Sequence, residues 1–315
     1  RQRQMCIRDR NYNSLFYKNQ NFILCENQIS KVDDFLIDNW LERLYFERLE
    51  RKSIFINELL ELSNYDFEAV LFQLLAKNFG LKVNGEAFLQ LAKSIDFSVV
   101  RKVQFDENQI TALFFGQAGF LEDLIDDNYH QQLKNEYQYL KLKHKLQSIS
   151  KNTFQFFRMR PQNFPTIRIT QLASLFYKNQ NLFSKLMSIT KKEDFYEFFS
   201  IEINDFWKTH YTFEKESKKS SKKLTKPFVD LLLINTIIPL KFVYLKSRGE
   251  VDEQSFLNLI KQISLEKNSV ISKFSDLKID AKNAMESQAL LELKNNYCKK
   301  KRCLHCAIGN TLLRN

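Results

Sequence analysis

Glycine and proline, the residues that most often end helices and form tight turns, are scarce in this chain: it has 6 Gly and 4 Pro among 315 residues. Aromatic side chains are plentiful, with 29 Phe and 12 Tyr, so the chain has ample apolar surface to bury in a core. This composition favours long helices joined by few turns. The sequence therefore predicts an all-α fold, a multi-helix domain with few or no strands.

Helical periodicity supports this prediction along the chain. In 33–51, apolar residues recur at spacings of three and four, with charged residues between them. Asp66 precedes another such pattern and Gly80 follows it, and these residue types are typical of a helix start and a helix end. Further helices are expected at 52–63, 84–95, 107–117, 129–149, 252–264, 267–277 and 282–297.

The domain organisation is expected to be simple. Residues 1–10 look like translated sequencing-adaptor read-through, and on that interpretation they are an artefact and the natural start of the protein is missing. Residues 11–315 are then expected to form a single helical domain, with 11–150 and 151–315 as sub-domains in the alternative division.

The most apolar run, 227–245, is almost long enough to span a bilayer. Asp230 and Lys241 argue against insertion, because each charge near the middle of a membrane costs about 2.5–3.5 kcal/mol. Pro239 also lies within the run, so we expect a kinked helix buried in the protein core and no membrane association.

Three cysteines near the C-terminus, Cys298, Cys303 and Cys306, are spaced C-x4-C-x2-C within a basic run. A C-x2-C loop can place two sulfurs on one metal centre, and four ligands are usual. Cys25 is the best candidate for the fourth ligand, since a fold closed between its two ends would gain most from such a clip. His305 adjoins Cys306 and is an awkward co-ligand. The predicted centre is zinc or an iron–sulfur cluster, and ligand type does not decide between them.

Two other interpretations of the cysteines stay open. They could be free, reduced thiols on a basic tail, or they could form disulfides. The sequence shows no segment with the charged start and apolar core of a signal peptide. A reducing, cytoplasmic location is therefore expected, and it disfavours disulfides.

The centre of the chain gathers side chains suited to an anion. Arg158, Arg160 and Asn163 precede Pro165, which is well placed at the first position of a helix. In that helix Arg168 and Gln171 share a face on the side opposite the apolar stripe. Guanidinium groups and free backbone N–H groups at a helix start can bind phosphate. A purely structural role, in which an arginine caps carbonyls or pairs with a carboxylate, is the alternative.

The formal net charge of +11, or +8 without residues 1–10, favours anionic partners, with DNA or RNA first among them. An ordinary soluble basic protein would show the same charge. No catalytic set is visible: the sequence has no metalloprotease H-E-x-x-H, no G-x-S-x-G and no Gly-rich nucleotide loop, and its four histidines are scattered.

Several motifs together resemble one uncharacterised bacterial family, the domain of unknown function numbered twenty-eight fifty-one. They are Arg160-Pro-x-Asn-Phe-Pro165 with Arg168-Ile-x-Gln-Leu-Ala173, Gly116-Gln-Ala-Gly119, Asn235-Thr-x-x-Pro239, Ser287-Gln-Ala-Leu290, and the run from Tyr297 to Cys306. The resemblance covers most of residues 20–315 and identifies them with the C-terminal helical part of the family.

The resemblance implies little chemistry. Full-length members look as though they begin with a region similar to the metal-binding core of PD-(D/E)xK nucleases, and nothing in this chain matches that core. On this interpretation the chain is a fragment whose catalytic region lies upstream. Its expected role is nucleic-acid binding or processing, and the late thiol cluster is similar to the iron–sulfur staple of some helicase-nucleases. A helical interaction scaffold with a structural zinc and no nucleic-acid role is the alternative.

Overall fold

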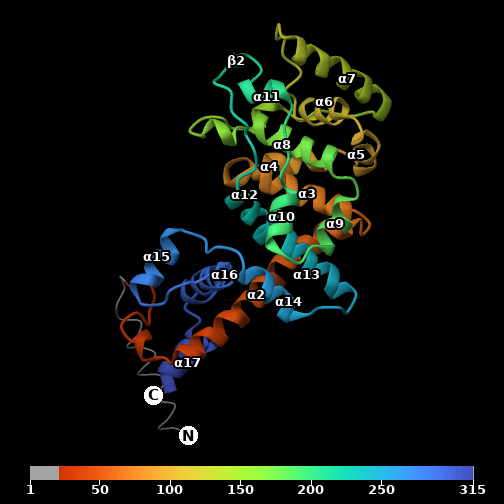
Figure 1. The fold of residues 1–315 in the computed structure, drawn as a ribbon. Helices are drawn as coiled ribbons and strands as arrows, with labels where there is room; N and C mark the ends of the chain where they lie inside the picture. The colour runs from red at the N-terminus through yellow and green to blue at the C-terminus, as the bar shows by residue number, and fades with distance from the viewer. Residues whose placement is uncertain (1–20, 315) are drawn as a thin grey trace. The chain divides into compact units, whose positions relative to one another are not determined.

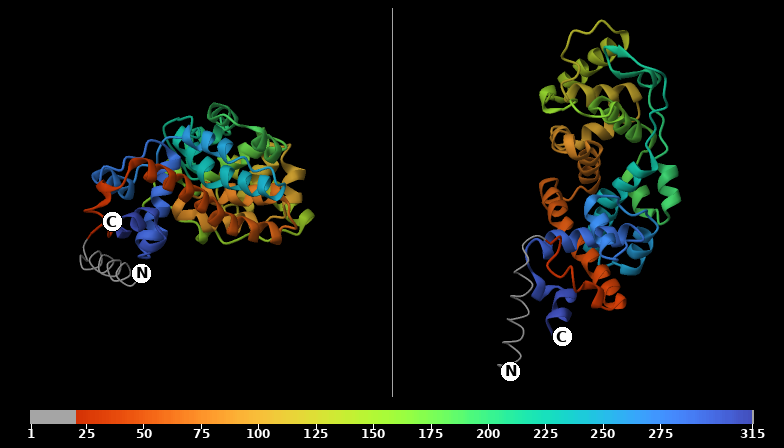
Figure 2. Two further views of the ribbon diagram at one scale, coloured as in Figure 1. Left: turned by 90° about the horizontal axis from the view of Figure 1, so that it is seen from below. Right: turned by 90° about the vertical axis from the view of Figure 1, so that its left-hand side faces the viewer.

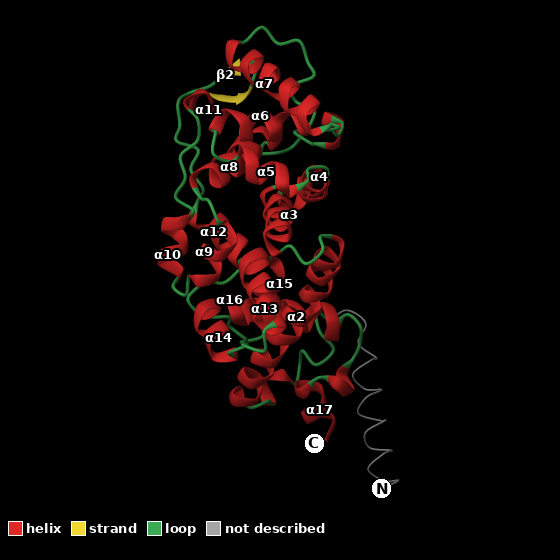
Figure 3. Ribbon diagram, turned by 90° about the vertical axis from the view of Figure 1, so that its right-hand side faces the viewer, coloured by secondary structure: helices red, strands yellow, loops and turns green. Residues whose placement is uncertain are grey.

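A computed structural model of the chain describes residues 21–314 and confirms the all-α prediction (Figure 1). Within this range the only strands are β1 (His210–Thr212) and β2 (Lys215–Glu216), which form one short antiparallel hairpin (Figure 3). The interpretation of residues 1–10 as an artefact lies outside the described residues.

The described chain forms two compact units. The terminal unit contains residues 21–55 and 250–314, which come from the two ends of the described chain. The central unit is Ile56–Gly249 and is coloured from orange through green to cyan in Figure 2. Residues 150 and 151, the sub-domain boundary considered from the sequence, both lie in the central unit.

The central unit begins within the last turns of α2 (Asp34–Leu62), and most of its helices start at the residue types expected of N-caps. Asp66 accepts hydrogen bonds from two backbone N–H groups at the start of α3, and Gly80 ends that helix, as predicted. Asp96, Asp106 and Asp127 cap three later helices in the same way. The helices that follow α2 and precede the β1–β2 hairpin are α3 (Phe67–Phe79), α4 (Leu81–Lys93), α5 (Phe97–Val103), α6 (Glu107–Gln117), α7 (Asn128–His144), α8 (Pro165–Lys178), α9 (Leu182–Ser188), α10 (Lys192–Phe198) and α11 (Asp205–Thr209).

The Gly116–Gly119 motif joins α6 to its neighbours. A Cβ atom at Gly116 would lie 2.0 Å from Cγ of Tyr137 in α7, so only glycine allows these helices to approach this closely. Gly119 has φ +77° in the following turn. Between them the buried Gln117 side chain bonds Ser94 and Gln147 and accepts a bond from the Tyr137 hydroxyl. The motif is therefore a close helix contact followed by a turn.

The apolar run forms one continuous helical stretch, Lys226–Ser247, made of α12 (Lys226–Leu232), a π-helical turn (Leu233–Ile237) and α13 (Ile238–Ser247). Pro239 has no N–H to donate to the carbonyl four residues earlier, and the wider π turn precedes it. By length and composition alone the stretch could cross a membrane. Leu232, Ile237 and Leu240 are, however, fully buried inside the central unit, as expected of a core helix.

The terminal unit contains the first part of α2 (Asp34–Leu62), followed after the central unit by α14 (Glu253–Lys261), α15 (Ser269–Asp276), α16 (Ala284–Glu292) and α17 (Ala307–Arg314). The sequence predicted two helices in 33–63, whereas α2 is continuous, so the predicted break near residue 52 is wrong. A π-helical turn, Leu293–Cys298, extends α16 and ends at Cys298, so the helix predicted at 282–297 is present.

Buried polar contacts hold the terminal unit together. Glu292, 3% exposed, pairs with Arg51 and with Arg48 of α2, the latter at 3.7 Å between Nη1 and Oε2. Five residues later the Tyr297 hydroxyl donates to Glu47 at 2.6 Å. These contacts fasten α16 and its π turn to α2 across a long sequence separation.

Candidate anion-binding site

The residues predicted to bind an anion divide into an exposed group and a group that is buried or partly buried. Asn163, Arg168 and Gln171 come together in the central unit and line one pocket. Arg158 and Arg160 are exposed on the segment that leads to Asn163, and neither lines the pocket. Three of the five residues predicted to bind an anion therefore lie at one pocket.

The start of α8 positions Asn163, Arg168 and Gln171. Pro161–Asn163 forms a 3-10 turn, and Pro165 occupies the first turn of α8, as predicted. The first turn of α8 contains no acidic residue, and Phe164 at its N-cap makes no side-chain hydrogen bond to it. Unpaired backbone N–H groups at a helix N-terminus give that end partial positive charge. Arg168 lies within a turn of this end, so two positive features coincide.

Arg168 is buried, and no carboxylate in the described part of the chain pairs with it. Nη1 donates to Gln171 Oε1 at 2.9 Å and Nη2 donates to Asn163 Oδ1 at 2.7 Å. The guanidinium carbon lies 3.8 Å from the ring centroid of Phe228. Burial lowers the pKa of Arg168 to about 10, so it stays charged at neutral pH. The amide oxygens leave its charge uncompensated, and its 8% exposed fraction corrects the expectation that this face of α8 lies opposite the buried side.

The pocket beside Arg168 has a volume of about 330 Å³. Its lining contains no Asp or Glu, and residues 220–225 complete it. Arg168 and Ser220, which both line this pocket, each have one buried polar atom without a hydrogen-bond partner, Arg168 Nε and Ser220 Oγ. Buried polar groups are nearly always paired in proteins, so two unpaired donors in one basic pocket indicate a site for an acceptor-rich ligand.

Lys222 holds the 220–225 segment in place, and the sequence gave no sign of this role. Its ammonium donates to the backbone oxygens of Trp207 and His210 and lies 3.9 Å from the ring centroid of Tyr211. Gln171 Nε2 in turn donates to the Lys222 carbonyl at 2.8 Å. Burial lowers the pKa of Lys222 to about 8. The Lys-rich stretch 214–223 is thus anchored on one side of the pocket.

Replacing Lys222 with methionine is expected to destabilise the central unit by about 2 kcal/mol, because hydrogen bonds to a charged group contribute about 1.5–3 kcal/mol and two buried carbonyls would lose their donor. Chemical denaturation measures the change. Lys223→Met is the matched control, since its exposed ammonium pairs only at 3.5 Å with the exposed Glu202. Equal effects of the two substitutions would contradict the anchoring role.

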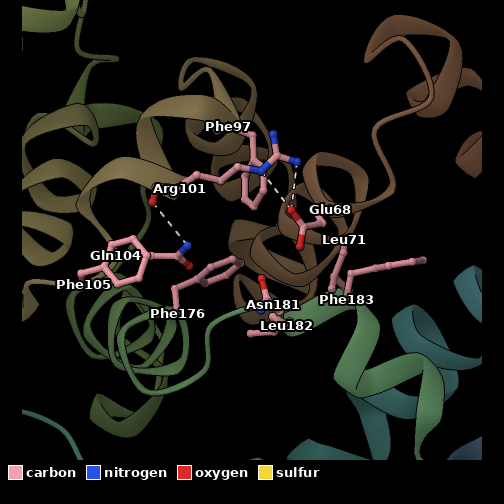
Figure 4. Close-up of a pocket in the computed structure, with 10 residues that line it drawn as sticks. All are labelled: Glu68, Leu71, Phe97, Arg101, Gln104, Phe105, Phe176, Asn181, Leu182 and Phe183. Atoms are coloured by element: carbon pink, nitrogen blue, oxygen red, sulfur yellow. Dashed lines mark hydrogen bonds and ion pairs between the residues drawn. The ribbon is translucent and has the colours of Figure 1, made fainter.

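A second pocket in the central unit contains an arginine whose charge is paired with carboxylates (Figure 4). It is lined by Arg101 and Glu68 together with several phenylalanines and has a volume of about 280 Å³. Arg101 bonds Glu68 at 2.9 Å and Asp66 at 2.7 Å, so its charge is already neutralised. This pocket therefore attracts an anion less strongly than the pocket at Arg168.

The four predicted metal ligands all lie in the terminal unit, and all four are free thiols. Cys303 and Cys306 are buried, and Cys25 and Cys298 are partly buried. Within 21–314, no three Cys, His, Asp or Glu side chains are grouped closely enough to form a metal site as they stand.

The comparisons with known proteins give one match. A family model described as "Protein of unknown function (DUF2851)" matches residues 5–269, which is most of the chain. The match ends before the segment that contains Cys298, Cys303 and Cys306. No curated protein and no solved structure matches the chain.

Proposed function

Because the chain belongs to the DUF2851 family, whose description assigns no function, we propose a function from the chain's own geometry: the central unit binds the phosphate backbone of DNA or RNA. The observation that carries the proposal is Arg168, a buried guanidinium with no carboxylate partner, beside a basic pocket. In a nuclease-related protein, such a unit would hold the nucleic-acid substrate while another region cleaves it.

A phosphate group suits the donors of the pocket. Arg168 Nε and Ser220 Oγ each have a hydrogen bond to give, and phosphate oxygens accept several bonds at once. The charge of the phosphate would compensate the buried guanidinium, and the N-terminus of α8 would add a favourable field. Asn163 and Gln171 hold the guanidinium in position, so little side-chain freedom would be lost on binding.

The segment that leads into the pocket favours nucleic acid over a small phosphorylated molecule. Phe157 is 80% exposed, and the guanidinium carbon of Arg158 lies 5.1 Å from its ring centroid. Arg160 follows, also exposed. Exposed aromatic rings among basic side chains are typical of surfaces that stack bases and follow a single-stranded backbone. On the other side of the pocket the exposed residues Lys218, Lys219 and Lys223 extend the positive charge.

The test is binding of fluorescently labelled single-stranded and duplex DNA and RNA oligonucleotides by the full chain at several salt concentrations. Arg168→Gln is expected to weaken binding about tenfold or more. The slope of the logarithm of the binding constant against the logarithm of the salt concentration should also fall in magnitude by about one. Arg168→Lys, which keeps the charge but loses the planar fork, should restore only part of the affinity. Arg101→Gln is the matched control, since its charge is already paired, and it should leave affinity unchanged.

Phe157→Ala separates base stacking from phosphate binding. It is expected to weaken single-stranded binding by about 1–3 kcal/mol and to leave duplex binding nearly unchanged. If wild-type protein shows no salt-dependent binding to any of the oligonucleotides, or if Arg168→Gln and Arg101→Gln behave alike, the proposal is wrong. The first result would favour the alternative, a helical interaction scaffold without a nucleic-acid role.

A further inference from the structure

The terminal unit contains all four described cysteines, and contacts join the segments that carry them, although these segments come from opposite ends of its sequence. Leu24, next to Cys25, packs against Cys303 and Leu313. The Lys294 ammonium donates to the backbone oxygen of Phe22, which ties the segment before Cys25 to the π turn that ends at Cys298. Cys303 starts the 3-10 turn Cys303–His305, and Cys306 directly precedes α17.

All four thiols have a raised pKa, and burial is the main cause in each case. Burial raises the pKa of Cys25 to about 12, and the neighbouring Cys306 and Cys303 add to this effect. Burial also raises the pKa of Cys298, with further contributions from Cys25, Cys306 and Cys303.

Several N–H groups are directed at Cys306. Backbone N–H groups of Ile308 and Gly309 and the indole N–H of Trp40 partly offset the effect of burial, which raises the pKa of Cys306. Trp40 is 6% exposed, and its Nε1 has no hydrogen-bond partner other than this thiol. A neutral thiol is a weak acceptor, whereas a thiolate is a strong one. The surroundings of Cys306 therefore suit a metal-bound thiolate.

Gly309 allows the C-terminal segment to fold tightly over this place. A Cβ atom there would lie 2.5 Å from the Cys303 backbone oxygen, so a larger residue would push α17 away from the Cys303 turn. The close approach keeps the Ile308 and Gly309 N–H groups beside Cys306.

We propose that the terminal unit binds one metal centre with four thiolate ligands, a zinc ion or an iron–sulfur cluster, through Cys25, Cys298, Cys303 and Cys306. Both centres take thiolates in a tetrahedral arrangement, so the ligands alone do not select between them. Because the sulfurs are not grouped at ligand spacing as they stand, binding draws them inward and tightens the unit. The centre links the two chain segments of the unit, 21–55 and 250–314.

The first test is the metal and sulfide content of the full chain, purified without oxygen and dialysed against metal-free buffer. About one zinc per chain, or iron with a similar amount of acid-labile sulfide and visible absorption, is the expected result. Cys25→Ser is expected to lose most of the metal, although this residue lies far in sequence from the others. Cys6→Ser is the matched control with the same chemical change, and His305→Ala should also keep its metal because His305 is exposed.

A second measurement covers the case in which Cys25→Ser does not fold. Native wild-type protein is treated with an alkylating reagent, with and without a chelator, and the labelled cysteines are identified by mass spectrometry. All four thiols should be protected until the chelator is added. Protection of only three, full metal content in Cys25→Ser, metal-free protein, or disulfides among these cysteines would each overturn the proposal. None of these outcomes bears on the pocket at Arg168, which lies in the other unit.

Discussion

Gly116→Ala is expected to destabilise the central unit by about 3 kcal/mol or more, the largest effect we expect of any single added methyl group. The new Cβ would lie between 2.0 and 2.4 Å from three ring carbons of Tyr137. The ring cannot move aside cheaply, because it is buried and its hydroxyl donates to Gln117 Oε1 at 3.0 Å. α6 and α7 must therefore separate, and the buried Gln117 bonds would be lost with them. Thermal and urea denaturation of the two proteins measure the difference.

Gly85→Ala is the control for this substitution. Gly85 also lies within a helix, but the nearest atom to its added Cβ, the Lys77 oxygen, is 3.2 Å away. Small adjustments there are offset by the better helix propensity of alanine, so the change should stay within about 1 kcal/mol. A melting temperature of Gly116→Ala close to that of Gly85→Ala would show that α6 and α7 do not pack as described.

Glu292→Gln is expected to cost the terminal unit about 3 kcal/mol at neutral pH, because removing one partner of a buried ion pair leaves the other uncompensated. Most of this cost comes from Arg48, because only 16% of its side chain is exposed, compared with 45% for Arg51, and water can therefore solvate its charge less. The fluorescence of Trp40, the one tryptophan of the terminal unit, follows its unfolding. Glu42→Gln is the control, since its bond to Lys261 is much more exposed.

The effect of Glu292→Gln should depend on pH in a defined direction. Burial acts to raise the pKa of Glu292, but the hydrogen bond and charge of Arg51, with Asn296 and Arg48, hold it below the usual value of 4.5. The carboxylate thus contributes stability above pH 4.5 that is lost as the pH falls through the lowered pKa of the folded state. The two proteins should therefore converge in acid. A difference that stays constant between pH 7 and pH 3 would contradict this account.

Local patterns in the sequence predicted most helices and their ends. Asp66, Gly80 and Pro165 act through contacts within a few residues, so their roles could be inferred without knowing the fold. The break expected near residue 52 was wrong because a change in composition does not interrupt backbone hydrogen bonds, and α2 continues through it. The apolar run 227–245 had the composition of a core helix or a membrane helix, and burial inside the central unit identifies it as a core helix.

The sequence predicted the pocket residues on α8 but not those that lie about fifty residues further along the chain. Arg168 and Gln171 are three residues apart on one helix, so their shared face was predictable. Periodicity could not reveal that this face is also buried, because α8 is enclosed by other elements from Pro165 to Phe176. Ser220 and Lys222 reach the pocket by tertiary contacts about fifty residues further along the chain, and no local pattern marks such contacts.

The terminal unit is interrupted in sequence by the whole of the central unit. During translation, residues 21–55 therefore leave the ribosome long before the segment 250–314 with which they pack. The central unit can bury its own core in that interval, whereas the first part of α2 must wait with its apolar face and the Cys25 thiol uncovered. Assembly of the terminal unit is thus a late event in biogenesis, and the waiting segment is the part of the nascent chain most in need of a chaperone.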